Sequence, residues 1–98
     1  MKINMDKNGS KLTVALEGRL DTTTSPELEA DLKPELDGAA ELTMDLAGLE
    51  YISSAGLRVL LSAHKLMSRH GSMKLTNVSE TVMEILDVTG FTDILTIE

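Results

Sequence analysis

The chain has 98 residues, no cysteine and a formal net charge of −7, which together restrict the classes of protein it can belong to. A chain of this length folds as one domain, residues 1–98, around one small core, and without cysteine it has no disulfide and no thiolate chemistry. Binding to DNA or RNA depends on clustered cations, so the acidic balance argues against a direct nucleic-acid role. The sequence shows no signal peptide and no apolar run near the roughly 20 residues of a membrane span, so we expect a cytoplasmic protein without direct membrane insertion.

The N-terminal segment predicts a β-hairpin. Asn8-Gly9 is the strongest short hairpin signal, because these residues accept the positive φ angles of tight turns. On both sides of it apolar and polar residues alternate, as they do in half-buried strands. The alternating apolar residues are Ile3, Met5, Leu12, Val14 and Leu16.

The segment Gly18–Pro26, GRLDTTTSP, predicts a loop that leads into a helix. Two ways of starting that helix fit the residues. Thr24 with Glu27 matches a capping box, and Ser25 with Pro26 matches an N-cap followed by proline at the first helical position. The two starts differ by one residue, and spacing alone leaves both open.

A leucine at every fourth position then predicts a helix with a narrow apolar stripe. The leucines are Leu28, Leu32 and Leu36. Pro34 is expected to kink or end this helix near Lys33, because proline lacks the backbone N–H of a helix interior. Alternation over Leu42–Leu46 predicts a strand, followed by a turn around Gly48.

A long helix follows the serine pair at Ser53 and Ser54. Its broad apolar surface comprises Leu57, Val59, Leu60, Leu61, Ala63, Leu66 and Met67. Arg69 and His70, followed by Gly71, form a favourable C-terminus.

The rest of the chain predicts a strand, a helix and a strand. Met73–Thr76 is the first of these strands, Ser79 caps a helix closed by Gly90, and Ile94–Ile97 is the last strand. The expected order is ββαβαβαβ. It corresponds to an α/β fold with a small mixed sheet of four or five strands and three or four packed helices.

The sequence offers little that could perform catalysis. A serine nucleophile needs a base within hydrogen-bond reach, but His64 lies about 15 Å along the helix from Ser54 and His70 lies farther still. The chain contains no phosphate-binding loop motif and no histidine pair with metal-ligand spacing. We therefore expect no enzyme activity, no cofactor and no metal.

The turn Ser53-Ser54-Ala55-Gly56 has two possible roles. A serine at a helix start contributes about 1 kcal/mol by accepting a bond from a free amide, and this cap could be the whole explanation. One serine is enough for a cap, however, and Gly56 costs about 1 kcal/mol relative to alanine inside the first turn. A phosphate at a helix N-terminus beyond a strand is also favoured electrostatically, so the turn permits a phosphoserine site.

Several segments together resemble the STAS domain family of anti-sigma factor antagonists and sulfate-transporter tails. The similar segments are GRLDTTTSPEL (18–28), LTMDLAGLEYI (42–52), SSAGLRVLLSAHK (53–65) and ILDVTGFTDIL (85–95). The ISSAGL segment combined with the earlier GxLD motif is specific, whereas either one alone would be weak.

In bacterial antagonists of that family, the serine after an aspartate is phosphorylated by an anti-sigma factor that is itself a kinase. The resemblance places this serine at Ser54 and matches Asp21 to the aspartate of the GxLD motif. Ser53 stands where the family has aspartate, and Arg58 stands where the antagonists often have glycine. Arg58 is four residues beyond Ser54, so it could pair with a phosphate there, pair with an acidic partner, or simply be solvated.

The resemblance implies a regulatory, protein-binding function in transcription. The unmodified chain would bind an anti-sigma factor with serine-kinase activity, phosphorylation would end that binding in a partner switch, and a phosphatase could reverse it. The free chain is expected to be a monomer. The expected contact residues are Asp21, Thr22, Thr23, Thr24, Ser25, Ser53, Ser54, Gly56, Leu57 and Arg58. The alternatives are a non-phosphorylated STAS subunit of a membrane transport complex, for example for lipids, and a nucleotide-sensing domain.

Overall fold

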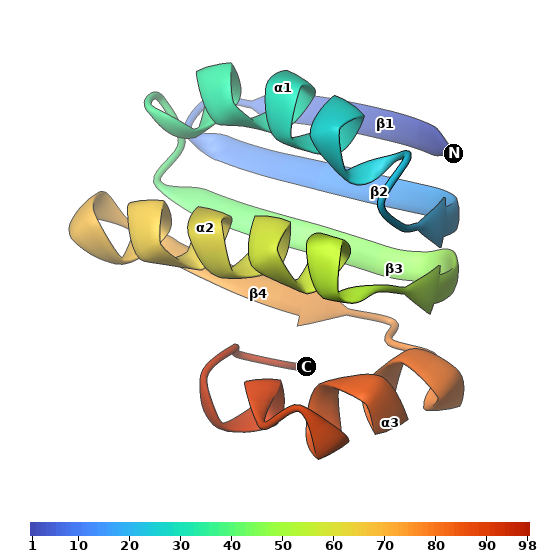
Figure 1. Cartoon of the computed structure of the whole chain (residues 1–98). Helices are drawn as coiled ribbons and strands as arrows, with labels where there is room; N and C mark the ends of the chain where they lie inside the picture. The colour runs from blue at the N-terminus through green and yellow to red at the C-terminus, as the bar shows by residue number, and fades with distance from the viewer.

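The computed structural model describes all 98 residues as one mixed β-sheet with helices packed on it (Figure 1). The strands β1 (Lys2–Asn8), β2 (Lys11–Leu20), β3 (Glu41–Ile52) and β4 (Ser72–Thr76) lie in the order β1-β2-β3-β4. β1 is antiparallel to β2, and the pairs β2–β3 and β3–β4 are parallel. The helices are α1 (Ser25–Leu36), α2 (Ser54–His70) and α3 (Glu80–Val88), with a short 3-10 helix, η1, at Phe91–Asp93. The predicted α/β fold with a small mixed sheet is confirmed.

The sheet has one apolar face and one polar face, because side chains alternate along each strand. One apolar row crosses every strand and ends in the C-terminal segment: Met5, Val14, Met44, Leu75 and Ile97. The adjacent row faces the other side and is exposed or half-buried: Asp6, Thr13, Thr43 and Lys74. α1 and α2 cover the apolar face (Figure 1), where a core of 23 buried apolar residues forms.

The predicted hairpin is confirmed, with the turn shifted by one residue. β1 ends at Asn8 and β2 begins at Lys11, so the connection consists of Gly9 and Ser10. Gly9 has a φ of +64°, a backbone conformation that glycine adopts without steric cost.

α1 starts and ends differently from the sequence-based expectation. Thr24 occupies the N-cap position but makes no side-chain cap hydrogen bond, because its hydroxyl is engaged elsewhere, as described below. The helix also continues past Pro34 to Leu36, which corrects the end expected near Lys33. Leu36 is only 2% exposed, so its burial in the core favours keeping the last turn helical despite the missing N–H.

The turn expected around Gly48 is not present, because β3 runs without interruption through this residue. Ala15 pairs with Asp45 whereas Glu17, two residues on, pairs with Gly48, so β3 holds an extra residue there. Such a bulge breaks the alternation that marks a strand in the sequence. A Cβ at Gly48 would lie 2.7 Å from Cγ of Glu17, so glycine permits the close approach of β2 and β3.

The final strand expected at Ile94–Ile97 is also corrected. Ile97 forms a single parallel bridge with Leu75 of β4, supported by two backbone hydrogen bonds of 2.9 Å at Leu75. Before it the chain forms η1, so too few residues remain in register for a ladder. The helix after Ser79 is confirmed as α3, with the Ser79 hydroxyl accepting from the amide of Val82.

The lengths of the helices are those of helices packed on a sheet. α2 is the longest, at 17 residues. None of the helices combines the length and the apolar character needed to cross a bilayer.

Candidate functional site

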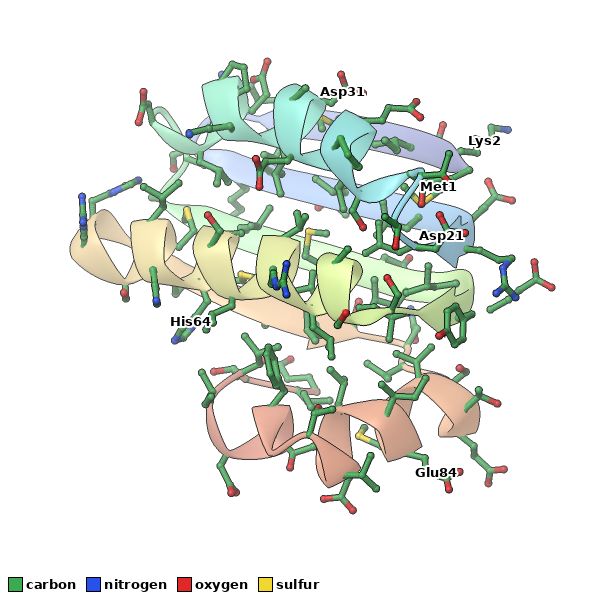
Figure 2. The ribbon with its side chains drawn as sticks, viewed as in Figure 1. Met1, Lys2, Asp21, Asp31, His64 and Glu84 are labelled. Carbon is green, nitrogen blue, oxygen red and sulfur yellow. The ribbon has the colours of Figure 1, made fainter.

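The two predicted site segments meet at one edge of the molecule, where β2 and β3 end and α1 and α2 begin (Figure 1). Leu20 and Ile52 pair as the last residues of their strands. The amide of Ser53 then donates to the carbonyl of Leu20 at 2.9 Å. Asp21, the residue after Leu20, lies at this edge, and His64 lies on α2 away from it (Figure 2). The loop at Asp21 and the start of α2 are therefore held together by backbone geometry.

The two adjacent serines have different roles at the start of α2. Ser53 is the N-cap: its backbone is extended, and its hydroxyl accepts a hydrogen bond from the amide of Gly56 at 3.4 Å. Its carbonyl accepts the first helical bond, from Leu57, at 2.9 Å. Ser54 is the first helical residue, is exposed, and makes no side-chain hydrogen bond within the chain. Capping therefore explains Ser53 and leaves the Ser54 hydroxyl free.

The glycine in the first turn of α2 has an internal reason. A Cβ at Gly56 would lie 2.7 Å from Cγ of Leu20 and 2.8 Å from Cγ1 of Ile52. These distances are shorter than side chains tolerate, so glycine lets the helix start rest on the ends of both strands. Close packing against the protein's own core therefore explains why a glycine stands in the first turn.

The loop after β2 is organised by Asp21. One of its carboxylate oxygens, Oδ1, accepts from the amides of Thr23 at 3.0 Å and Thr24 at 3.1 Å. The Thr24 hydroxyl accepts from the amide of Asp21 at 2.9 Å and donates to the carbonyl of Arg19 at 2.7 Å. The amide of Thr24 is the main cause that holds the pKa of the Asp21 carboxyl below its usual value, with smaller contributions from Thr23 and Arg19. Asp21 is thus a charged organiser of the loop.

A shallow hollow separates the first turns of α1 and α2. It is lined by Thr22, Ser25, Pro26, Glu29, Ala55, Arg58 and Val59. Ser25 is only 3% exposed, and its hydroxyl has no hydrogen-bond partner in the chain. Arg58 is exposed and takes part in none of the five ion pairs of the structure.

The predicted contact residues divide into an exposed set and a buried set. The exposed or half-buried ones are Asp21, Thr22, Thr23, Thr24, Ser53, Ser54 and Arg58. Ser25, Gly56 and Leu57 are buried, and Leu57 is only 5% exposed. A docking partner cannot reach these three residues directly, so they could only support such a surface from beneath, and partner contact by the exposed set stays a prediction.

Sequence patterns missed one pair at the same edge. The guanidinium of Arg19 lies 4.5 Å from the ring centroid of Tyr51, and its Nε lies 4.0 Å from the Asp21 carboxylate. Arg19 and Tyr51 pair across β2 and β3, but the bulges in β3 hide that register from the sequence. We define the contact surface as Arg19, Asp21, Thr22, Thr23, Tyr51, Ser53, Ser54 and Arg58.

Comparison with known proteins assigns the fold and the family. A family model described as Mlab, STAS domain matches residues 3–96. The chain belongs to the STAS domain family.

Individual relatives support the assignment over almost the full length. BtrV of Bordetella bronchiseptica is 38% identical, with 96% of this chain and 83% of that protein covered. The anti-sigma-B factor antagonist of Bacillus subtilis is 34% identical, with 99% and 92% covered. An anti-sigma factor antagonist from Mycobacterium paratuberculosis, at 18% identity, shares the fold with a TM-score of 0.89 over 98% of this chain and 83% of that one. The family model and these relatives together match almost the full length of the given chain, and the relatives place it among the anti-sigma factor antagonists.

The chemistry available at this edge of the STAS domain is that of modification and docking. An exposed hydroxyl at a helix N-terminus can accept a phosphoryl group from an external kinase. The free amides of the first turn and the helix dipole then stabilise the added charge. The surface itself is polar and loop-organised, which suits reversible contact with another protein.

Proposed function

We propose that this STAS domain binds an anti-sigma factor through the contact surface and that phosphorylation of Ser54 ends the binding. The observation that carries the proposal is the division of roles between the two serines. Ser53 makes the cap, whereas Ser54 is exposed on the surface with an unengaged hydroxyl. The names of the relatives support the choice of partner. The partner would act as a binding target and as the serine kinase, a phosphatase would restore the hydroxyl, and the free chain would be a monomer.

The proposed switch works by charge and leaves the fold in place. Phosphorylation adds about 1.5 to 2 negative charges at pH 7, and the N-terminus of α2 tolerates them. The complex does not, because the doubly charged group would lose its hydration against the partner. A loss of about 3 kcal/mol weakens binding more than a hundredfold, which is enough for regulation.

Affinity capture from the native cells tests this proposal. Tagged parent, Ser54→Ala and Ser54→Asp chains are used as baits, and captured proteins are identified by mass spectrometry. We expect a kinase-type anti-sigma factor with the parent and with Ser54→Ala, and its loss with Ser54→Asp. Ser62→Asp is the matched control, since Ser62 is an exposed serine on the same helix, and it should retain the partner. Equal capture by both aspartate variants would contradict the proposal.

One observation favours a second function, that of a STAS subunit in a membrane transport complex without phosphorylation. Ser53 replaces the aspartate that precedes the phosphorylated serine in the antagonists it resembles, so a kinase would lack that carboxylate. Intact-mass measurement on the chain purified from native cells in growth and stress separates the two functions. A phosphorylated fraction in either condition excludes the second function, and its absence in both, with transporter proteins captured, supports it.

A further inference from the structure

Arg58 is the cation best placed to act on Ser54. It lies one turn beyond Ser54 on α2, at the i,i+4 spacing that brings side chains together on a helix surface. The next cationic residue of α2 is Lys65, eleven residues from Ser54 and about 16 Å along the axis. Only Arg58 can therefore reach a group attached to Ser54 from the same helix.

Arg58 has no competing ion pair in the unmodified chain. The cation nearest to the Asp21 loop, Arg19, is already engaged with Asp21 and Tyr51. Arg58 instead borders the hollow between α1 and α2, where Glu29 is the single acidic lining residue and does not approach within ion-pair distance. Its guanidinium is free to reorient.

The hollow has an unmet hydrogen-bonding group of its own. The Ser25 hydroxyl is buried and unpartnered at the start of α1, across the hollow from Arg58. In the unmodified chain this corner of the contact surface thus presents one exposed cation, Arg58, above a buried hydroxyl that has no partner. The exposed guanidinium suits an acidic side chain of a docking protein.

We propose that the phosphate on Ser54 captures Arg58, an inference that rests on the proposed function of Ser54. Transfer of the γ-phosphoryl group from ATP forms the Oγ–P bond, with ADP leaving and the hydroxyl proton released. The guanidinium then bonds the phosphate oxygens through two N–H donors, a geometry in which arginine surpasses lysine. Phosphorylation consequently changes the contact surface in two ways. It adds the phosphate on Ser54, and it ties the Arg58 guanidinium to that phosphate, so that the cation is no longer available at the edge of the hollow.

The second pKa of the phosphate reports this capture directly. That pKa lies near 6 in phosphoserine, and a nearby cation lowers it by stabilising the dianion. The helix N-terminus lowers it as well, but equally in every variant of Arg58. The other ionisable groups at this edge also stay constant between variants: Arg19, Asp21, Glu29, Glu50 and Tyr51.

The experiment compares phosphoserine-54 proteins by ³¹P NMR titration. Phosphoserine is inserted during translation into the parent, Arg58→Gln and Lys65→Gln chains, so no cellular kinase is needed. We expect Arg58→Gln to raise the phosphate pKa by about 0.2–0.4 units, the equivalent of an exposed i,i+4 ion pair. Lys65→Gln removes the same charge from α2 at a distance beyond the screening length and should leave the pKa unchanged.

The result that overturns the inference is an equal phosphate pKa in the parent and Arg58→Gln proteins, or an equal shift in both glutamine variants. The test is independent of the proposed function. A chain that is never phosphorylated in cells would refute the function while the pKa difference could still be present.

Discussion

Replacing each serine of the pair by alanine separates their roles in stability. Ser53→Ala removes the cap on the amide of Gly56. Loss of a serine cap typically costs about 0.5–2 kcal/mol, and the 3.4 Å bond is long, which places the expected loss near 0.5–1 kcal/mol. For a domain of 98 residues this lowers the Tm by about 2–8 °C. Ser54→Ala removes an exposed hydroxyl without a partner, so the change should stay within about 0.5 kcal/mol.

Urea unfolding followed by circular dichroism measures both variants against the parent, with thermal melts as a second readout. In partner capture, by contrast, Ser54→Ala should have the larger effect. Ser54→Ala cannot be phosphorylated and should stay bound to the partner, whereas Ser53→Ala keeps the phosphorylatable hydroxyl and should still be released. A Ser54→Ala chain as destabilised as Ser53→Ala would refute the assignment of the cap to Ser53. A Ser53→Ala chain as stable as the parent would also refute the assignment of the cap to Ser53.

Further substitutions test other parts of the site. Gly56→Ala places a methyl group against Leu20 and Ile52. Overpacking costs about 1–3 kcal/mol and the better helix propensity of alanine offsets about 1 kcal/mol, so urea unfolding should show a loss of stability of up to about 2 kcal/mol. A stabilised variant would contradict the close packing at Gly56. Asp21→Asn should destabilise the chain at pH 7. The carboxyl has a lowered pKa in the folded state. The ionised carboxylate therefore contributes to folding stability above its unfolded pKa of about 4, and this contribution disappears as the pH falls through the folded pKa. A stability difference between parent and Asp21→Asn that persists unchanged to pH 2 argues against a stabilising role of the charge. Ser53→Asp keeps a good cap and should preserve the melting curve while raising the rate of phosphorylation by the partner kinase, and an unchanged rate would show that the missing carboxylate is not limiting.

Element types were predictable where one local pattern dominated. The alternating apolar residues of β2, from Leu12 to Leu16, and the apolar surface of α2 each follow from burial on one side. The cap at Ser79 depends only on local chemistry and was also predictable. Such signals are contained within a few residues, so no knowledge of the tertiary structure is needed.

The errors arose where a tertiary contact decided the local structure. Gly48 predicts a turn, but in the structure it lies at a bulge where β3 passes close to β2. Pro34 predicts a kink or an end of the helix; the helix does not end there, because burial of Leu36 favours a further helical turn. The segment at Ile94–Ile97 has the composition of a strand, but η1 leaves only one residue in register with β4.

The sequence motifs predict where the candidate site lies, whereas burial in the folded chain decides which of its residues are exposed. The motif identified the two segments but could not distinguish residues that face outward from residues that face the core. Ser25 and Leu57 belong to the second group. The pair Arg19 and Tyr51 is not predictable from sequence patterns, because only the irregular register of β2 and β3 brings the two side chains together.

The central claim is that added charge at Ser54 prevents docking without unfolding the chain. Isothermal titration of the purified partner with unmodified chain and with chain carrying phosphoserine at position 54 tests it most directly, with a melting curve recorded for each form. The account predicts binding weakened more than a hundredfold by the phosphate, with both forms folded. Equal affinities for the two folded forms would contradict it.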